Sequence, residues 1–409
     1  MRHRSVLILT AVVTTGALTL TACGSRDDDG GDKGGSDGKK TTVLIGVDAP
    51  LTGDLSALGL GIKNSVDLAA KTANKNNEVP GVEFKIVSFD DKATPSEGQQ
   101  NATKLVANKD VLGVVGPLNS SVSQSMQSVF NAAKLVQVSP ANTAPELTQG
   151  PNWAAGDKKR QFDSYFRTAT TDAIQGPFAA RYMFQDAGVK NVYVVDDQKT
   201  YGKGLAKTFS EEFTKLGGTI VGTDHVNPDD RDFNSIVTKV KSKGADAVYY
   251  GGEYPAAGPF SQQLKDAGVN IPLMGGDGIF SGDFIKLNKK AEGDLATSVG
   301  EPVAKIDTAK QFVANYAAGG YKEAYEAYGG YSYDSAWAII QAVKAVVKDG
   351  KVPSDARAQV MAAMSQVNFA GVTGQVSFDE FGDTTNKALT VYKVEGGEWK
   401  DVKSGKFAE

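Results

Sequence analysis

The sequence predicts an α/β protein in which mainly parallel sheets are covered by helices on both faces. Short apolar runs typical of buried strands alternate with stretches whose apolar residues recur at helical spacing. The alternation begins near Val43 and restarts at Tyr165. Since 409 residues are too many for one ordinary core, the two series of strands predict two lobes.

The first series contains the clearest alternation. The run Val43 to Val47 is apolar apart from one glycine, and a proline and glycine turn follows it. In the next stretch Ile62, Val66 and Ala73 fall on one helical face. The expected strands are 43–47, 84–89, 111–116 and 135–138, and the expected helices are 61–74, 96–108 and 120–133.

The second series repeats this order, so the repeated unit is a whole lobe rather than a short solenoid repeat. Its expected strands are 192–195, 219–221, 247–250 and 271–274, and its expected helices are 204–216, 233–243 and 258–267. A further helix over 336–347 and short strands within 375–394 complete the prediction.

Residues 1–22 have the three-part plan of a secretory signal. Arg2 and Arg4 precede an uncharged, mostly apolar run, and small residues precede Cys23. The apolar run of about 15 residues is short of the roughly 20 needed to span a bilayer. The run Leu20-Thr-Ala-Cys23 resembles a bacterial lipobox, which implies that Cys23 carries a lipid anchor. The alternative is an ordinary signal peptide with an incidental cysteine.

The segment after the signal predicts a flexible tether. Residues 23–41 contain the stretch Gly24 to Lys40, in which no residue is apolar. Such a segment cannot bury a core and is expected to be disordered. The globular part is therefore expected outside the cytoplasm, held at the cell membrane by lipid on Cys23. No later segment is apolar enough to span a bilayer.

Composition argues against several function classes. The chain has 44 basic and 48 acidic residues, so no nucleic-acid partner is expected. It contains only His3 and His225 and a single cysteine, so no metal site, no Ser–His–acid set and no internal disulfide is expected. No phosphate-binding loop suggests a nucleotide. We therefore expect that the protein is not an enzyme and that it has no catalytic residues and no cofactor.

Two loops at the ends of predicted strands carry unusual chemistry. Ligands of parallel α/β sheets bind at the carboxyl ends of strands. After the third strand comes Gly116-Pro-Leu-Asn-Ser120, where a helix begins. The hydroxyl of Ser120 either caps that helix or donates to an anion at its N-terminus. After the fourth strand, Ser139 to Thr148 contains two prolines that fix the backbone.

The two loops, read as GPLNSS and SPANTAPELT, resemble those of the leucine/isoleucine/valine-binding proteins, which are type I periplasmic binding proteins of amino-acid ABC importers. Further matches in order are VDAPLTGDLSALG, SFDDKATPSEG, DQKTYGKGLA, HVNPDDRDFNSIVTKVK, ADAVYYGGEYP and MGGDG. The resemblance implies a two-lobed clamshell with three hinge crossings, and we expect the protein to be a monomer. It places lobe I at 42–168 plus 300–376 and lobe II at 169–299 plus 377–409.

The resemblance also implies ligand contacts at matching positions. Ser120 matches a serine that holds the amino-acid carboxylate, and Thr143 matches a threonine that donates its N–H and hydroxyl to the same solute. Ala141 matches a residue whose carbonyl accepts from the ammonium. Tyr201 matches a tyrosine that closes over the ligand. Asp277 falls where the family has a glutamate that pairs with the ammonium, although an aspartate between glycines is often only a turn residue.

Three departures bear on specificity. Leu58 stands where relatives commonly have an aromatic ring, Glu253 stands where they have a tyrosine, and Asp277 is one methylene shorter than the family glutamate. Either Glu253 and Asp277 face one cleft and favour a solute more cationic or polar than leucine, or Glu253 points to solvent while Tyr254 takes the aromatic role. Tyr328 is a weaker candidate for the lobe I side of the cleft.

The sequence therefore predicts an extracytoplasmic solute-binding lipoprotein of an ABC importer. Its expected ligand is an amino acid, branched-chain or related, which it delivers to the membrane permease. The alternative is a ligand-sensing binding protein for an amide or cationic solute that feeds a membrane receptor.

Overall fold

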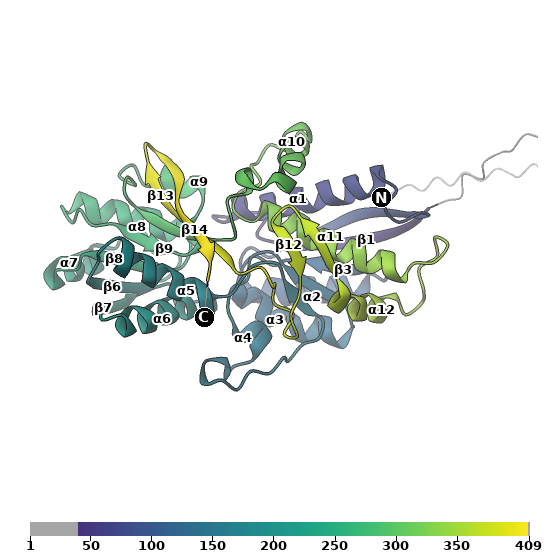
Figure 1. The fold of residues 1–409 in the computed structure, drawn as a ribbon, viewed down its shortest axis with the longest axis horizontal. Coiled ribbons are helices and arrows are strands. Elements are labelled where there is room, and N and C mark those ends of the chain that lie inside the picture. The colour runs from purple at the N-terminus through teal and green to yellow at the C-terminus, as the bar shows by residue number, and fades with distance from the viewer. Residues whose placement is uncertain (1–39, 408–409) are drawn as a thin grey trace, which may run out of the picture. The chain divides into compact units, whose positions relative to one another are not determined.

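The computed structural model describes residues 40–407, and these form an α/β fold around two large sheets (Figure 1). The predicted signal, Cys23 and the predicted linker up to residue 39 lie outside the described residues. Strand β1 begins at Thr41, so the last residue of the predicted linker already pairs in a sheet. No helix within 40–407 is both long and apolar enough to cross a membrane.

The first sheet has five strands in the order β2-β1-β3-β4-β5, and all neighbours are parallel. The strands are β1 (Thr41–Ala49), β2 (Val82–Asp90), β3 (Val111–Val115), β4 (Val136–Ser139) and β5 (Tyr165–Arg167). The helices among them are α1 (Ser56–Lys75), α2 (Pro95–Ala107), α3 (Ser120–Ala132) and α4 (Glu146–Gln149). Later segments that join this half are α10 (Lys310–Ala318), α11 (Gly329–Val346), α12 (Ala356–Ala363) and the hairpin β11 (Asn368–Gly371) and β12 (Gly374–Ser377).

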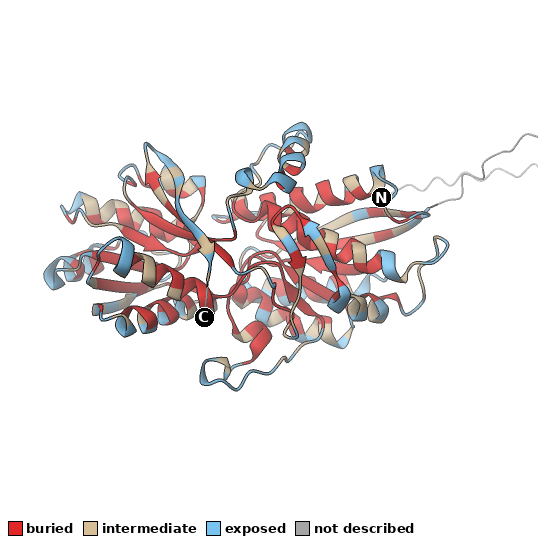
Figure 2. Ribbon diagram, in the orientation of Figure 1, coloured by how far each residue is buried: buried red, intermediate tan, exposed pale blue. Residues whose placement is uncertain are grey.

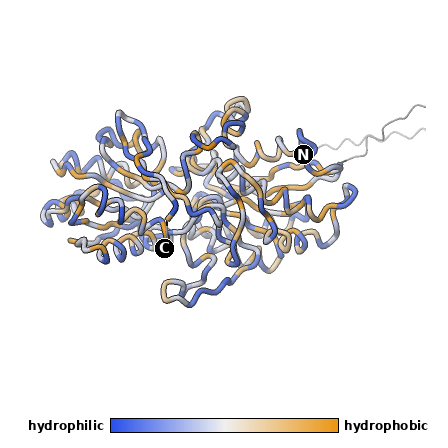
Figure 3. Tube along the Cα trace, viewed as in Figure 1, coloured by the Kyte–Doolittle hydropathy of each residue, from blue (hydrophilic) through white to orange (hydrophobic). Residues whose placement is uncertain are grey.

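Helices cover both faces of the first sheet, which explains why its strands read as nearly continuous apolar runs. In β1, Val43 and Ile45 belong to the core cluster that includes α1 and α11, whereas Leu44 packs on the cluster of α2 and α3. Gly46 also faces α2, and a Cβ atom there would lie 2.7 Å from Leu105. Figure 2 shows the inner strands of the sheet as largely buried, and Figure 3 shows hydrophobic residues along them, whereas the edge strand β2 is mostly half-buried.

The second sheet has seven strands in the order β14-β13-β10-β9-β8-β6-β7. They are β6 (Asn191–Asp196), β7 (Thr219–His225), β8 (Ala247–Gly251), β9 (Leu273–Gly275), β10 (Leu295–Val299), β13 (Ala388–Glu395) and β14 (Glu398–Lys406). The helices of this half are α5 (Asp172–Arg181), which continues as a π-helical turn over Tyr182–Asp186, α6 (Thr200–Lys215), α7 (Asn234–Lys243), α8 (Tyr254–Asp266) and α9 (Gly282–Leu287). Helices α5 and α6 pack on one face of the sheet, and α7 and α8 on the other.

The two sheets repeat one topology. In both, the second strand of the series lies at one side of the first, and the third, fourth and fifth follow on its other side. The five strands β7-β6-β8-β9-β10 are parallel, and antiparallel β13 and β14 extend the second sheet. The lobe-scale repeat expected from the sequence is therefore present. In the second half, strands β10 and β14 and helices α5 and α9 were not predicted.

Within 40–407 the chain passes between the two halves three times: after β5, after β10 and after β12. Arg167 at the end of β5 donates a 2.6 Å bond to Asp383, which lies in the passage between β12 and β13. Two of the passages are thereby tied to each other. The lobe boundaries given above stay a prediction.

Candidate ligand-binding site

The candidate site lies where loops after corresponding strands of the two sheets meet. Asn119, after β3, donates its amide hydrogen to the carboxylate of Glu253, after β8. Tyr254 donates its hydroxyl hydrogen to the carbonyl of Asp54, after β1. These loops follow the carboxyl ends of parallel strands, which is where such sheets bind ligands.

Residues from both halves of the protein line a small cavity of about 20 Å³ beside these loops. Six of the seven residues predicted as ligand contacts line it, together with four others. The lining residues are Leu58, Leu118, Asn119, Ser120, Ala141, Tyr201, Glu253, Asp277, Gly278 and Tyr328. The cavity has room for about one water molecule. The predicted roles of these residues as ligand contacts stay predictions.

Ser120 offers a free hydroxyl to this cavity. It is the first residue of α3, and the residue at the N-cap is Asn119. Its side chain is 2 % exposed, and its Oγ has no hydrogen-bond partner. Capping therefore does not explain the serine. A buried hydroxyl beside the N-terminal N–H groups of a helix is suited to an anion.

The shape of the loop before Ser120 depends on Gly116. This residue has φ +117°, and a Cβ atom on it would lie 2.0 Å from the carbonyl oxygen of Asp48. Only glycine allows this conformation together with so close an approach of β3 to the end of β1.

The second predicted loop is fixed by Arg167, which is fully buried. Its guanidinium donates to the carbonyl oxygens of Asn142 (3.1 Å) and Ala144 (2.8 Å). Ala141 lines the cavity, whereas Thr143 is not among the lining residues. The Thr143 hydroxyl lies 3.0 Å from Asp172 Oδ2 and donates to it.

Asp277 supplies a buried carboxylate on the opposite side of the cavity. Its Oδ1 accepts from Tyr201 and Gln175, and its Oδ2 accepts from Tyr328, each at 2.9 Å. Burial raises the pKa of Asp277, while these donors act in the opposite direction. The residue opens a 3₁₀ turn (Asp277–Ile279), so it is a turn residue as well as a member of the site.

The glycines that flank Asp277 leave room for Tyr201. A Cβ atom on Gly276 would lie 2.4 Å from Tyr201 Oη, and one on Gly278 would lie 2.9 Å from the tyrosine ring. The Tyr201 hydroxyl accepts from the N–H of Gly278 at 3.0 Å and donates to Asp277. The pattern Gly-Asp-Gly thus positions a carboxylate and a phenol together.

Gln175 links two buried acids, and no motif in the sequence indicates this role. Its Nε2 lies 2.9 Å from Asp172 Oδ1 and 2.9 Å from Asp277 Oδ1 and donates to both. Burial, followed by the charge of Asp277, raises the pKa of Asp172 well above its usual value. Helix α5, which carries Gln175, contains Gly176 and Pro177, and these obscure its helical pattern.

Glu253 lies in the cavity and is paired. Lys199 Nζ is 2.7 Å from its Oε2, and Asn119 donates to its Oε1. Glu253 and Asp277 thus line the same cavity, and the lysine offsets the charge of the glutamate; which solute they favour stays a prediction. Tyr254 is 2 % exposed but does not line the cavity. Lys199 was missed because nothing in its sequence context indicates a partner 54 positions away.

Comparison with known proteins identifies the family of this chain. A family profile described as "Periplasmic binding protein" matches residues 42–398. The Leu/Ile/Val-binding protein BraC3 of Rhizobium johnstonii is 31% identical over 356 residues, which cover 87% of this chain and 92% of that protein. The chain belongs to the leucine/isoleucine/valine-binding protein family. The resemblance drawn from the two loops is thereby confirmed.

Solved structures agree with the family and the fold. The substrate-binding protein LivJ of the branched-chain amino acid transporter of Streptococcus pneumoniae, in complex with isoleucine, has a TM-score of 0.79 at 27% identity and covers 90% of this chain and 100% of its own. The leucine-binding protein LivK of Thermotoga maritima has a TM-score of 0.77 at 26% identity and covers 88% and 98%. The predicted α/β, two-lobed fold class is confirmed. The named relatives are binding proteins rather than enzymes.

This member of the Leu/Ile/Val-binding family has a second, larger space beside the small cavity. It measures about 450 Å³ and is called the outer chamber here. Its lining residues are Pro50, Thr52, Gly53, Asp54, Leu55, Lys92, Ala93, Thr94, Asp197, Lys199, Pro228, Asp229, Tyr250, Glu253, Pro255 and Ala256. Glu253 lines both spaces, so they adjoin at its side chain.

Proposed function

We propose that the protein is an extracytoplasmic solute-binding lipoprotein of an ABC importer that captures an amino acid, branched-chain or related. One observation carries the proposal: the small cavity places the unpartnered hydroxyl of Ser120 and the carboxylate of Asp277 around one space. An α-amino acid carries one negative and one positive group on neighbouring atoms. A donor for the first and an acceptor for the second are what its recognition requires.

In the proposed complex, the solute's carboxylate lies at Ser120 and the first N–H groups of α3. Its ammonium lies near Asp277 and the carbonyl of Ala141. The positive charge of the ammonium favours the ionised form of Asp277 and so opposes the effect of burial on its pKa. The apolar side chains of Leu58 and Leu118 complete the wall.

Binding requires the two lobes to separate and close again. A cavity of about 20 Å³ has no room for an amino acid, because it holds about one water molecule. Opening breaks contacts between the halves, including Tyr328 to Asp277 and Thr200 to Gln124. A solute that contacts both halves shifts the equilibrium toward the closed form by the contacts that exist only there. The permease would then receive the closed protein.

Titration calorimetry tests the proposal on purified protein that has been unfolded and refolded to remove any carried-over solute. We expect one-to-one binding of an amino acid from a panel of leucine, isoleucine, valine, lysine and arginine. Ser120→Ala should weaken it at least about tenfold, the size of a hydrogen bond to a charged group. Ser121→Ala is the matched control, because Ser121 is adjacent on α3 but does not line the cavity. Absence of binding across the panel would refute the proposal.

The proposed anchor is lipid on Cys23, and the proposed location is the outer face of the cell membrane. It is supported by the signal-like residues 1–22 and by the family, whose members are periplasmic binding proteins. Cys23→Ala should move the protein from the membrane fraction into the medium and abolish incorporation of labelled palmitate. Retention in the membrane without that label would contradict lipid anchoring.

The proposed mode of action is binding without catalysis, by a monomer. Within 40–407 no three His, Cys, Asp or Glu side chains group to hold a metal ion. The histidine of this region, His225, is exposed at the end of β7. Light scattering during size-exclusion chromatography measures the molar mass and so tests whether the protein is a monomer. Recovery of a chemically unaltered solute after binding tests the absence of catalysis.

A further inference from the structure

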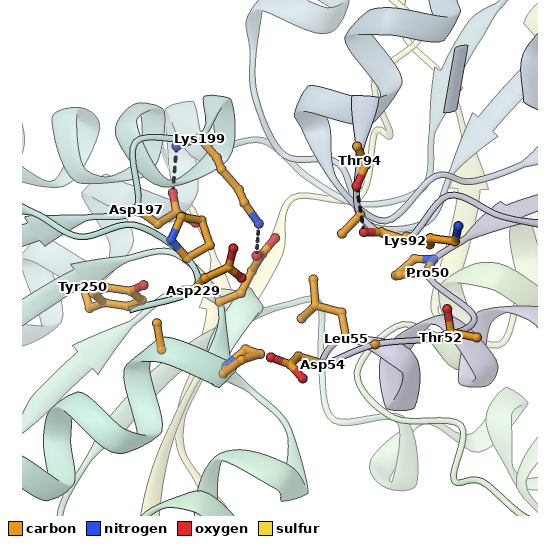
Figure 4. Close-up of a pocket in the computed structure, with 16 residues that line it drawn as sticks. Pro50, Thr52, Asp54, Leu55, Lys92, Thr94, Asp197, Lys199, Asp229 and Tyr250 are labelled. Carbon is orange, nitrogen blue, oxygen red and sulfur yellow. Dashed lines mark hydrogen bonds and ion pairs between the residues drawn. The ribbon is translucent and has the colours of Figure 1, made fainter. Parts of the chain in front are cut away.

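The outer chamber is too large to be explained by a small aliphatic solute. It measures about 450 Å³ and continues outward from the small cavity at Glu253. Figure 4 shows that residues of both lobes face it, with Asp197, Lys199, Asp229 and Tyr250 on one side and Thr52, Lys92 and Thr94 on the other. Once the lobes have opened and closed on a solute whose head group lies at Ser120 and Asp277, its side chain can extend past Glu253 into this chamber.

Two residues that line the chamber each carry a buried polar atom without a hydrogen-bond partner. Asp197 is 2 % exposed and Tyr250 is fully buried, yet Asp197 Oδ2 and Tyr250 Oη make no hydrogen bond. The other oxygen of Asp197 accepts the N–H of Lys199 at 3.0 Å. Leaving a buried polar atom unpaired costs about 1–3 kcal/mol. A bound group that supplies hydrogen-bond donors would remove this cost.

The two unpartnered atoms belong to neighbouring strand ends. Asp197 directly follows β6, and Tyr250 is the penultimate residue of β8, whose Gly251 pairs with Asp196. The two side chains are therefore held by adjacent parallel strands rather than by mobile loops. The glycine at position 202 allows helix α6 to lie close to the carboxylate of Asp197, because a Cβ atom on Gly202 would lie 2.2 Å from Asp197 Oδ1.

The chamber carries an excess of acidic groups. Its lining contains the acids Asp54, Asp197, Asp229 and Glu253 and the bases Lys92 and Lys199. Glu253 is paired with Lys199 at 2.7 Å, and Asp54 is paired with Arg231 at 2.6 Å. Among the ion pairs of residues 40–407, none involves Asp197. Burial, followed by the charge of Glu253, raises the pKa of Asp197 to about 7, while the charge of Lys199 acts in the opposite direction.

Part of the chamber wall is apolar. Pro50, Leu55, Pro228, Pro255 and Ala256 contribute to it, beside the hydroxyl-bearing Thr52 and Thr94. Such walls fit the methylene stem of a long side chain, which packs on apolar surface while its charged end finds polar partners.

We propose that the outer chamber is a subsite for the cationic end group of the solute's side chain, so that the protein binds a basic amino acid of the lysine or arginine class. Asp197 Oδ2 accepts a hydrogen bond from the ammonium or guanidinium, and Tyr250 Oη accepts a second. The inference rests on the proposed function, because it assumes that the head of the amino acid lies at Ser120 and Asp277.

The test compares lysine, arginine and leucine by titration calorimetry on the full chain and its variants. In the unaltered protein we expect lysine or arginine to bind at least about tenfold more tightly than leucine, since a hydrogen bond to a charged group is worth about that much. Asp197→Asn should lose most of this preference, and Tyr250→Phe should lose part of it. Both should bind leucine within about threefold of the unaltered protein.

The residues that precede Tyr250 and Asp197 in the sequence provide matched control variants. Tyr249 is also buried with an unpartnered hydroxyl but does not line the chamber, so Tyr249→Phe should leave the preference unchanged. Asp196→Asn serves the same purpose for Asp197. Leucine binding that exceeds lysine and arginine binding and is indifferent to Asp197→Asn and Tyr250→Phe would overturn the inference while leaving the proposed function standing. Absence of binding by all three amino acids would overturn the inference, and it would overturn the proposed function as well only if isoleucine and valine also failed to bind.

Discussion

The hydroxyl of Tyr328 on α11's N-terminal boundary lies 2.9 Å from Asp277 Oδ2 and donates to it across the two halves of the protein. Both side chains are buried. Burial, followed by the charge of Asp277, raises the pKa of Tyr328 well above its usual value. The phenol is therefore a neutral donor at any physiological pH. Tyr328 belongs to the half that contains the first sheet, and Asp277 belongs to the other half. The hydrogen bond between them therefore forms only when the two halves are in contact.

Tyr328→Phe should therefore weaken binding of the amino-acid solute. Removing the hydroxyl costs the closed form a hydrogen bond to a charged acceptor, worth about 1.5–3 kcal/mol, and should raise the dissociation constant at least about tenfold. Tyr316→Phe is the control, because Tyr316 Oη donates to the carbonyl of Glu323 away from the cavity. Calorimetry on both variants measures the difference. Equal dissociation constants for the two would mean that the bond plays no part in closure.

Much of the fold was predictable from the sequence because most strands are buried on both faces. Strands such as β3 and β8 are apolar throughout, and such runs are visible without knowledge of their neighbours. Strand β14 alternates between exposed and half-buried residues and is paired only at the edge of the second sheet. Its sequence carries a weaker signal, and it was not predicted.

The site was predictable where loops carry a recognisable order of residues. Ser120, Ala141 and Asp277 come from such loops, and the structure brings them to one cavity. Partners such as Lys199 for Glu253 depend on which strand ends become neighbours. Periodicity carries no information on that pairing, because it describes only the residue's own element. The same holds for Thr143, whose hydroxyl donates a hydrogen bond to Asp172, a partner that the sequence pattern does not indicate.

Gly276→Ala should disturb the site because Tyr201 occupies the space that a Cβ atom needs. The new atom would lie 2.4 Å from Tyr201 Oη and 2.4 Å from Leu205 Cδ2. We expect a loss of stability of about 1–3 kcal/mol, the usual cost of overpacking a core, together with weaker solute binding. Urea unfolding and calorimetry measure the two effects.

Gly204→Ala provides the opposite control for that experiment. Gly204 lies inside α6, and a Cβ atom there would meet nothing within 4 Å. Alanine is favoured over glycine in a helix interior by about 0.5–1 kcal/mol. The variant should be more stable than the unaltered protein and should bind the solute equally well. A stable, fully active Gly276→Ala protein would show that Tyr201 can move without consequence.

Arg167→Met should destabilise the protein and loosen the loop that carries Ala141. Its guanidinium is fully buried, pairs with Asp383 at 2.6 Å and donates to the carbonyls of Asn142 and Ala144. Removing one partner of a buried pair leaves an uncompensated charge and costs about 3–5 kcal/mol. Urea unfolding measures this loss.

Lys85→Gln is the control for the arginine variant. Lys85 pairs with Glu83 at 2.9 Å, but both side chains are largely exposed, at 54% and 42%. An exposed pair contributes about 0–1 kcal/mol. If the two variants lost equal stability, the burial of Arg167 would not be the cause.

The stability of the protein should fall as the pH rises from about 4 to about 6, because buried aspartates bind protons more strongly in the folded state. Burial raises the pKa of Asp91 to about 6, and burial together with the charge of Asp91 raises the pKa of Asp48 well above its usual value. In the unfolded chain both ionise near 3.9. Between these values the folded state holds more protons than the unfolded state, so each increase in pH favours unfolding.

Asp91→Asn should flatten this dependence. The asparagine oxygen can still accept the N–H of Ala93, which lies 2.7 Å from Asp91 Oδ1. Without the second carboxylate, Asp48 also loses the charge that raises its pKa. Urea unfolding at pH 4, 5 and 6 should therefore show a smaller loss of stability in this variant than in the unaltered protein, whereas Asp110→Asn at an exposed position should behave like the unaltered protein. An unchanged slope in Asp91→Asn would assign the pH dependence to other buried acids, such as Asp334, whose pKa burial raises to about 6.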